Sequence, residues 1–159
     1  KAGMSLSWSD IVEEAKKAES FRSVLDPDYG EFFAGGRMVE KIQDFCRKTN
    51  QPVPETVGQI ARCIYESLAL KYRWALERLE EIKGQRIDTL NIVGGGSQDG
   101  YLNQQTANAT GLTVFAGPTE GTALGNLMVQ FIHSGDFADL AEARAAIRRS
   151  FEIKEYQPE

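Results

Sequence analysis

One stretch, residues 89–100, constrains the fold of this chain more than any other. A largely apolar run over residues 89–93 leads directly into three consecutive glycines and then into a polar segment that can begin a helix. A strand, a tight loop and a helix N-terminus have this order of residue types. Glycines let backbone N–H groups approach a ligand, and the first N–H groups of a helix attract anions. The junction therefore predicts an anion site, with phosphate as the expected ligand.

Strands and helices are expected to alternate around this stretch. The predicted elements are a strand over residues 89–93, a helix over about 99–109, a strand over 112–115 and a helix over about 119–133. Gly111 is expected to close the first of these helices. This order predicts parallel strands joined by a right-handed crossover. Two strands are few for a sheet, so either further strands in this sequence are missed or the rest of the sheet lies outside it. We favour the second alternative and expect an open edge that favours self-association.

The beginning of the chain also predicts helix. Ser9 or Asp10 can cap a first helix that runs to about Ala18. A loop rich in turn residues follows, and Phe32 and Phe33 are expected to anchor it onto the domain.

Apolar residues at helical spacing predict three further helices. They cover about residues 37–48, 57–84 and 137–149. The longest, of about 28 residues, is expected to pack at the centre of the domain and to end at Gly84, and a coiled coil is the alternative. The last is expected to end at the basic pair Arg148 and Arg149. Residues 156–158 are expected to form a tail.

Composition excludes several classes of protein. With 159 residues, of which 42% are hydrophobic and 26% charged, the chain suits a single soluble domain over residues 1–159. A formal net charge of −5 without a dense Lys/Arg cluster argues against a nucleic-acid partner. No apolar run approaches the roughly 20 residues that cross a bilayer, and no signal peptide is evident at the start. We therefore expect no membrane partner and a cytoplasmic location.

The cysteines and the single histidine offer little chemistry. Cys46 and Cys63 match no zinc-site spacing, and two buried thiols are the favoured interpretation. A helical hairpin could instead bring them together as a disulfide, if their Cα atoms lie within about 7 Å. His133 is expected to lie at a helix end, and Glu66 and Asp88 receive no role.

The two common glycine-rich nucleotide motifs do not fit residues 94–99. A Rossmann fingerprint needs a small residue where this chain has Asp99, and a Walker loop needs a Gly-Lys-Ser/Thr sequence that does not follow the glycines. A tight strand-to-helix turn without any ligand remains an alternative.

Several segments together resemble a known family. They are residues 93–98, 102–104, 117–120 and 123–126 with Gly111, and upstream residues 51–55, 61–63 and 66–69 with Tyr72. This set resembles the C-terminal domain of the FGGY carbohydrate kinases, over about residues 26–131. The upstream segments are most similar to those of members that phosphorylate L-rhamnulose.

The resemblance implies a helix-dominated α/β fold, part of a ribonuclease H-like (actin-like ATPase) lobe with a short parallel βαβα unit. In that family ATP lies between two domains, and a loop matching residues 94–99 contacts it through backbone atoms. The implied nucleotide-binding residues are Gly94, Gly95, Gly96, Ser97, Gln98 and Asp99. Gly95 matches the best-marked contact. Asp99 stands where the family usually has Asn near the adenine, and a carboxylate lacks the amide donor.

A second glycine-containing segment receives two interpretations. Gly121 and Gly125, four residues apart, allow close helix packing. The resemblance instead implies that residues 120–125 pack beneath the nucleotide loop and that Gly125 shapes the pocket without contacting the ligand.

The resemblance also identifies what this chain lacks. The family's catalytic Asp lies in a Gly-x-His-Asp-type motif, which is absent here, and the sugar is held by an N-terminal domain. The chain opens at Lys1 without an initiating Met, so we expect a piece of a longer protein that is inactive alone. The whole protein would use ATP and Mg²⁺ to make L-rhamnulose 1-phosphate and ADP. The alternative is a non-catalytic homologue that uses this lobe for binding or assembly.

Overall fold

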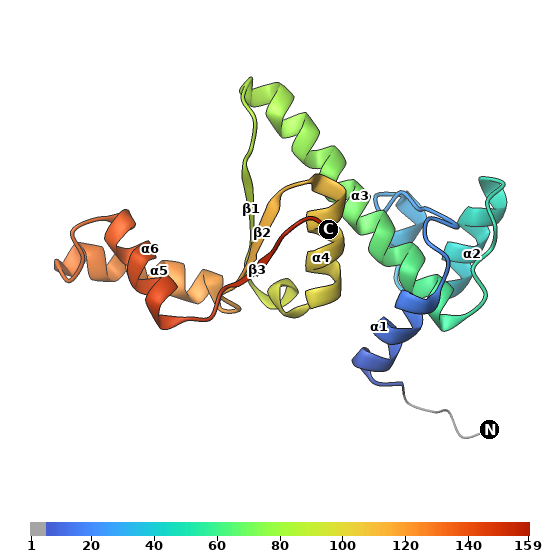
Figure 1. Cartoon of the computed structure of the whole chain (residues 1–159), viewed down its shortest axis with the longest axis horizontal. Coiled ribbons are helices and arrows are strands. Elements are labelled where there is room, and N and C mark those ends of the chain that lie inside the picture. The colour runs from blue at the N-terminus through green and yellow to red at the C-terminus, as the bar shows by residue number, and fades with distance from the viewer. Residues whose placement is uncertain (1–5) are drawn as a thin grey trace. The chain divides into compact units, whose positions relative to one another are not determined.

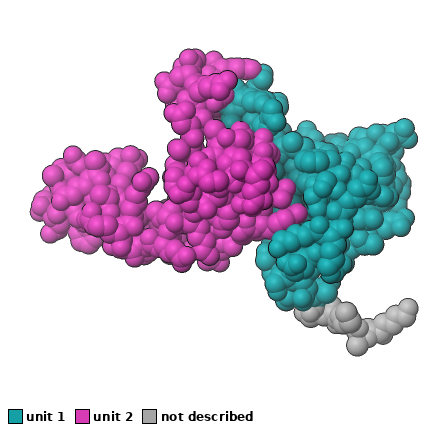
Figure 2. Space-filling model, in the orientation of Figure 1, with its two compact units in different colours: residues 1–78 teal, residues 79–159 magenta. Residues whose placement is uncertain are grey.

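The structure is a computed structural model that describes residues 6–159. It contains two compact units, unit 1 over residues 1–78 and unit 2 over residues 79–159 (Figures 1 and 2). The boundary falls within the long helix α3, Val57–Lys83. The expectation of a single domain over residues 1–159 stays a prediction.

Unit 1 is helical. Its elements are α1 (Trp8–Lys17), the 3-10 turn η1 (Gly30–Phe32), α2 (Met38–Lys48) and the first part of α3. The cap of α1 is Ser7 rather than the predicted Ser9 or Asp10. The Ser7 hydroxyl accepts a hydrogen bond from the Asp10 N–H at 3.2 Å, and the Ser7 N–H donates to the Asp10 carboxylate at 2.9 Å. Asp10 is thus the second half of a capping box.

The hydrophobic core of unit 1 lies between α2, α3 and the loop that precedes α2. Its buried members are Leu25, Ile42, Cys46 and Cys63. Phe32 packs against this core, as predicted for a loop anchor. The same prediction is wrong for Phe33, whose side chain is 77% exposed, because the 3-10 turn directs only one of the two adjacent rings inward.

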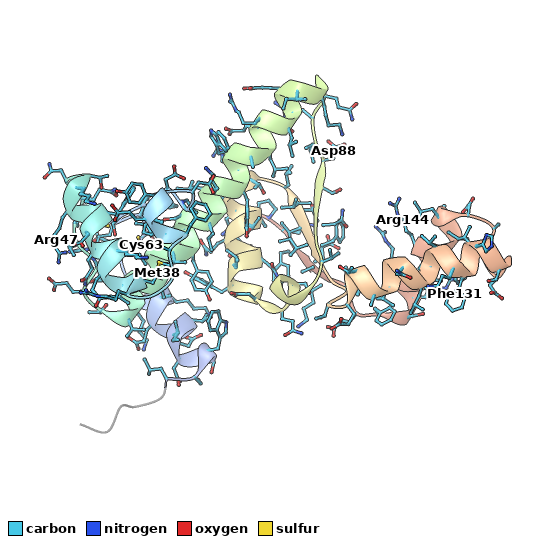
Figure 3. All side chains as sticks on the ribbon, turned by 180° about the vertical axis from the view of Figure 1, so that it is seen from behind. Met38, Arg47, Cys63, Asp88, Phe131 and Arg144 are labelled. Atoms are coloured by element: carbon cyan, nitrogen blue, oxygen red, sulfur yellow. The ribbon has the colours of Figure 1, made fainter. Side chains whose placement is uncertain are left out.

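The two cysteines are free buried thiols, as favoured from the sequence, and form no disulfide. Figure 3 shows Cys63 among the helices of unit 1. Burial raises the pKa of the Cys63 thiol to about 11. Burial also raises the pKa of the Cys46 thiol. Both groups are therefore protonated near neutral pH.

A buried ion pair within α3 also contacts the end of α1. The Glu66 side chain is only 2% exposed, and the Arg62 Nε–H donates to it at 2.8 Å. Glu66 also accepts a hydrogen bond from the Phe21 N–H at 2.7 Å. The Arg62 guanidinium donates to the backbone carbonyls of Ala15 and Ala18 at 3.3 and 3.0 Å. Arg62 therefore adds charge-assisted hydrogen bonds to carbonyls at the C-terminal end of α1.

Unit 2 contains the sheet. Its elements are the end of α3, β1 (Thr89–Ile92), the 3-10 turn η2 (Gly95–Gln98), α4 (Gly100–Thr110), β2 (Thr113–Ala116), α5 (Gly121–Ser134), α6 (Leu140–Ser150) and β3 (Lys154–Tyr156). Strand β1 pairs with β2 in parallel, with Thr89 opposite Thr113, as predicted. Strand β3 pairs with β2 in the antiparallel direction. The fold is helix-dominated with a small mixed sheet in the order β1-β2-β3.

The predicted tail over residues 156–158 is wrong for Tyr156, which is the last residue of β3 (Lys154–Tyr156). This strand pairs Val114 with Tyr156 and Ala116 with Lys154, about forty residues apart in the chain. The pairing gives β2 a neighbour on both sides and buries Val114 completely.

The helices of unit 2 end much as the sequence predicts. Gly111 adopts a left-handed conformation with φ of 70° at the C-terminus of α4, and Gly84 has φ of 66° just after α3. Helix α6 begins later than predicted, because the Asp139 carboxylate caps it by accepting from the Glu142 N–H at 2.9 Å. Helices α5 and α6 lie side by side (Figure 1). No helix within residues 6–159 is both long and apolar enough to span a bilayer.

Candidate functional site

The candidate site lies where β1 and β2 end. The glycine loop, residues 94–99, follows β1, and a second turn, residues 117–120, follows β2. The Gly117 N–H donates to the Ile92 carbonyl at 2.8 Å, and the Gly94 N–H donates to the Pro118 carbonyl at 3.1 Å. These two hydrogen bonds hold both turns together at the carboxyl ends of parallel strands, a usual place for ligands in α/β folds.

The glycine loop is built around Gly94. Gly94 has φ of 81° and ψ of −165°, a backbone conformation that is open essentially only to glycine. Its carbonyl accepts hydrogen bonds from Ser97, at 3.0 Å from the backbone N–H and 2.7 Å from the hydroxyl. These bonds close the 3-10 turn η2, which the sequence analysis did not anticipate.

Gly95 and Gly96 differ from Gly94. Neither has a positive φ. A Cβ added at Gly95 would meet no atom within 4 Å, and one at Gly96 would meet only the Ile92 Cγ2 at 4.0 Å. Neither backbone conformation nor packing within the described residues therefore requires glycine at these two positions.

Asp99 and Asn103 fix the start of α4 to the loop. The Asp99 carboxylate caps α4 by accepting a hydrogen bond from the Leu102 N–H at 3.1 Å. Asn103 is fully buried and donates its side-chain N–H to the Ser97 carbonyl at 3.0 Å. Sequence reasoning missed the role of Asn103, although an Asn one turn after a helix cap is a signal that could have suggested it.

A pocket of about 380 Å³ opens beside the glycine loop, in the size range of small-molecule sites. It is lined by Ser97 and Gln98 of the loop, by Ala116, Gly117, Pro118, Thr119 and Glu120, and by Phe151, Glu152 and Lys154. The last three residues come from the C-terminal segment. They were missed because the sequence analysis ended the structured part of unit 2 before them.

Of the predicted site residues, only Ser97 and Gln98 line this pocket. The Gln98 side-chain N–H reaches the Thr119 hydroxyl at 3.4 Å, which connects the loop to the second turn. Gly94, Gly95 and Gly96 form the adjoining bend, and Asp99 is used as a helix cap.

Close packing beneath the loop occurs at Gly121. A Cβ at Gly121 would lie 2.9 Å from the Val93 Cβ, so the start of α5 touches the residue that precedes the loop. A Cβ at Gly125 would meet nothing within 4 Å, and Gly125 does not line the pocket. The close packing beneath the loop therefore involves Gly121, which does not line the pocket either, and the pocket-shaping role of Gly125 stays a prediction.

The remaining candidate residues lie elsewhere. His133 occupies the last turn of α5, and Arg148 and Arg149 occupy the last turn of α6, as predicted. Within residues 6–159, no three His, Cys, Asp or Glu side chains are grouped so that they could hold a metal ion.

Known proteins are similar to most of this chain. Residues 1–134 match the FGGY family of carbohydrate kinases, C-terminal domain. The chain is 47% identical over 153 residues to a rhamnulokinase of Bacteroides thetaiotaomicron, covering 96% of this chain and 32% of that protein. It is 41% identical over 152 residues to a rhamnulokinase of Bacillus subtilis, covering 96% and 31%. The chain thus spans about a third of the length of these relatives.

A solved structure shares the fold. The xylulose kinase from Rhodospirillum rubrum matches 68% of this chain and 22% of its own, with a TM-score of 0.52 and 21% sequence identity. Together with the family match, this shared fold is consistent with the helix-dominated, actin-like lobe that the resemblance implied.

Proposed function

We propose that this chain, which belongs to the FGGY family of carbohydrate kinases, is the nucleotide-binding lobe of an ATP-dependent rhamnulokinase. The part of the family that the chain matches is the C-terminal domain. The whole protein would transfer the γ-phosphate of ATP to the 1-hydroxyl of L-rhamnulose, giving L-rhamnulose 1-phosphate and ADP. The names of the relatives that match almost the whole chain support this sugar over xylulose.

The observation that carries the proposal is the open space over Gly95. The φ of 81° at position 94 requires glycine. Gly95 has no positive φ, and a Cβ added there would meet no atom within 4 Å. A glycine that the chain's own structure does not require, next to a pocket at the ends of two parallel strands, is typical of a position where a ligand approaches the backbone. The proposed nucleotide contacts are Gly94, Gly95, Gly96, Ser97, Gln98 and Asp99.

The chemistry of these groups suits an adenine nucleotide. Backbone N–H groups of a bent glycine loop provide donors for phosphate or ribose oxygens. Asp99 provides a carboxylate acceptor but no amide donor, and the cap of α4 already uses one of its oxygens. We therefore propose that Asp99 mainly caps α4 and that only its other carboxylate oxygen contacts the nucleotide.

The other parts of the reaction lie outside this chain. Mg²⁺ would come with the triphosphate, whose oxygens it binds in kinases, and the sugar and the base for its hydroxyl would be held by the N-terminal domain. We accordingly expect the isolated lobe to be inactive. A cytoplasmic location and self-association through the open edge of β1 complete the proposal.

The test is the substitution Gly95→Val in the full-length protein. A Cβ at Gly95 would meet no atom of the chain within 4 Å, and the added side chain would fill the space where the nucleotide is proposed to lie. We expect the KM for ATP to rise about tenfold or more while L-rhamnulose binding stays unchanged. Steady-state kinetics with both substrates varied, and calorimetry with the sugar alone, measure the two effects.

Gly35→Val is the matched control. Gly35 also lacks a positive φ, and a Cβ added there would meet no atom within 4 Å. It lies in the loop before α2, in unit 1. The KM of the Gly35→Val variant for ATP should equal that of the wild type. Unchanged ATP kinetics in Gly95→Val, or no phosphorylation of L-rhamnulose by the wild type, would refute the proposal.

A further inference from the structure

We propose that the C-terminal segment, residues 151–154, is the third wall of the nucleotide pocket and that Lys154 binds a phosphate of the nucleotide. This inference rests on the proposed function, and it names a contact outside the glycine loop. The family match ends at residue 134, so this wall is contributed by a part of the chain beyond the matched domain.

The register of the sheet places Lys154 at the site. Lys154 is opposite Ala116, the last residue of β2, and both residues line the pocket. The next residue, Gly117, is hydrogen-bonded to the end of β1, from which the glycine loop departs. Antiparallel pairing thus brings a lysine to the point where the two parallel strands end.

The wall is fixed in place on both sides. Before β3, the chain passes so close to the second turn that a Cβ at Gly117 would lie 2.8 Å from the Glu152 carbonyl oxygen. After β3, the Gln157 carbonyl accepts a hydrogen bond from the Gln104 side chain at 2.7 Å, and the Gln157 amide oxygen accepts one from the Thr113 hydroxyl at 2.9 Å. Lys154 is therefore carried by a backbone that is held at both ends.

The charges around the pocket single out Lys154. The lining includes two carboxylates, Glu120 and Glu152, and Lys154 is its one basic residue. Among the described residues its ammonium group forms no ion pair, whereas Lys71 pairs with two aspartates at 3.2 and 2.7 Å. Because the carboxylates would repel a phosphate, Lys154 is the lining group that can offset its charge.

The pocket also has groups for the uncharged part of a nucleotide. Glu120 and Glu152 can accept hydrogen bonds from ribose hydroxyls, as acidic residues do in other nucleotide sites. The Phe151 ring adds an apolar surface to the same lining. This distribution predicts that Lys154 contributes to binding of ADP and ATP but not of adenosine.

The experiment compares ADP with adenosine in the full-length protein. Lys154→Met keeps the length of the side chain and removes its charge. Calorimetry should show ADP binding weakened about tenfold, the effect of losing one charge-assisted hydrogen bond, and adenosine binding within about twofold of the wild type. Lys154→Arg should restore most of the ADP affinity, and Lys83→Met, at the exposed end of α3, is the matched control with unchanged binding.

The outcomes separate this inference from the proposed function. Wild-type ADP affinity in Lys154→Met, together with weakened ATP kinetics in Gly95→Val, would overturn the role of Lys154 and leave the kinase proposal intact. Equal losses for ADP and adenosine would also overturn it, because they would indicate a distorted pocket instead of a lost phosphate contact. Unchanged kinetics in Gly95→Val would overturn the proposed function itself.

Discussion

The two turns at the ends of β1 and β2 both depend on glycine, but in different ways. In the second turn Gly117 has φ of 128°, and the Glu152 carbonyl fills the space where a side chain would start. In the glycine loop only Gly94 has a positive φ, and the space over Gly95 is open. The glycine of the second turn is explained by the chain itself, and Gly95 is not.

This difference separates two uses of the same residue type. Gly117 belongs to the fold, because it lets the C-terminal segment pass close to β2 and form a pocket wall. Gly95 is part of the proposed ligand site, because no atom beyond its chain neighbours lies within 4 Å of the position where its Cβ would be. Substitution of Gly117 should therefore lower stability, whereas substitution of Gly95 should weaken nucleotide binding with little change in stability.

The largest effect on stability is expected at the second turn. Gly117→Ala would place a Cβ 2.8 Å from a backbone oxygen at a φ of 128°. We expect the free energy of unfolding to fall by about 3 kcal/mol, measured by urea unfolding of the full-length protein. Gly111→Ala is the control, since its φ is 70° but its surroundings are open. Equal losses in the two variants would show that packing against Glu152 is unimportant.

An intermediate effect is expected at the junction of the loop and α4. Asp99→Ala removes the acceptor for the Leu102 N–H and should cost about 1 kcal/mol of stability. Asp99→Asn keeps a capping oxygen and should cost only a few tenths of a kcal/mol. The same urea experiment measures both variants. If Asn is as destabilising as Ala, the carboxylate acts through something other than the cap.

The smallest effect on stability is expected at Gly95. Gly95→Ala should leave the free energy of unfolding within about 0.5 kcal/mol of the wild type, because the Cβ meets no atom and no unusual φ is involved. The same variant should bind ATP more weakly, measured by calorimetry on the full-length protein. A loss of stability like that of Gly117→Ala would remove the distinction between the two turns.

The parts of this fold that were predictable are those set by local sequence. The periodic apolar residues of α3, the glycines after α3 and α4, and the order of β1, α4 and β2 each depend on residues close together in the chain. The parallel pairing of β1 with β2 followed from that order. Local patterns also placed the glycine loop between a strand and a helix.

The features that escaped prediction depend on contacts between distant residues. Strand β3 has three residues and becomes a strand through pairing with β2. The hydrogen-bond partners of Glu66 include Phe21, which is forty-five positions away in the chain, so no local sequence pattern predicts this contact. The Gly121 and Gly125 pair shows the same limit, because only the position of Val93 decides which glycine is crowded. The C-terminal wall of the pocket was missed for this reason.

The pairing of β3 with β2 has a consequence for where this domain can be divided. The match to the family model ends at residue 134, but the sheet uses residues 154–156. A polypeptide cut at the family boundary would keep β1 and β2 as a two-stranded ribbon with both edges unpaired, an arrangement prone to aggregation. It would also lose the strand that buries Val114. The end of the family model and the end of the sheet therefore differ in this lobe by about twenty residues, and a polypeptide designed to fold should extend to the end of β3.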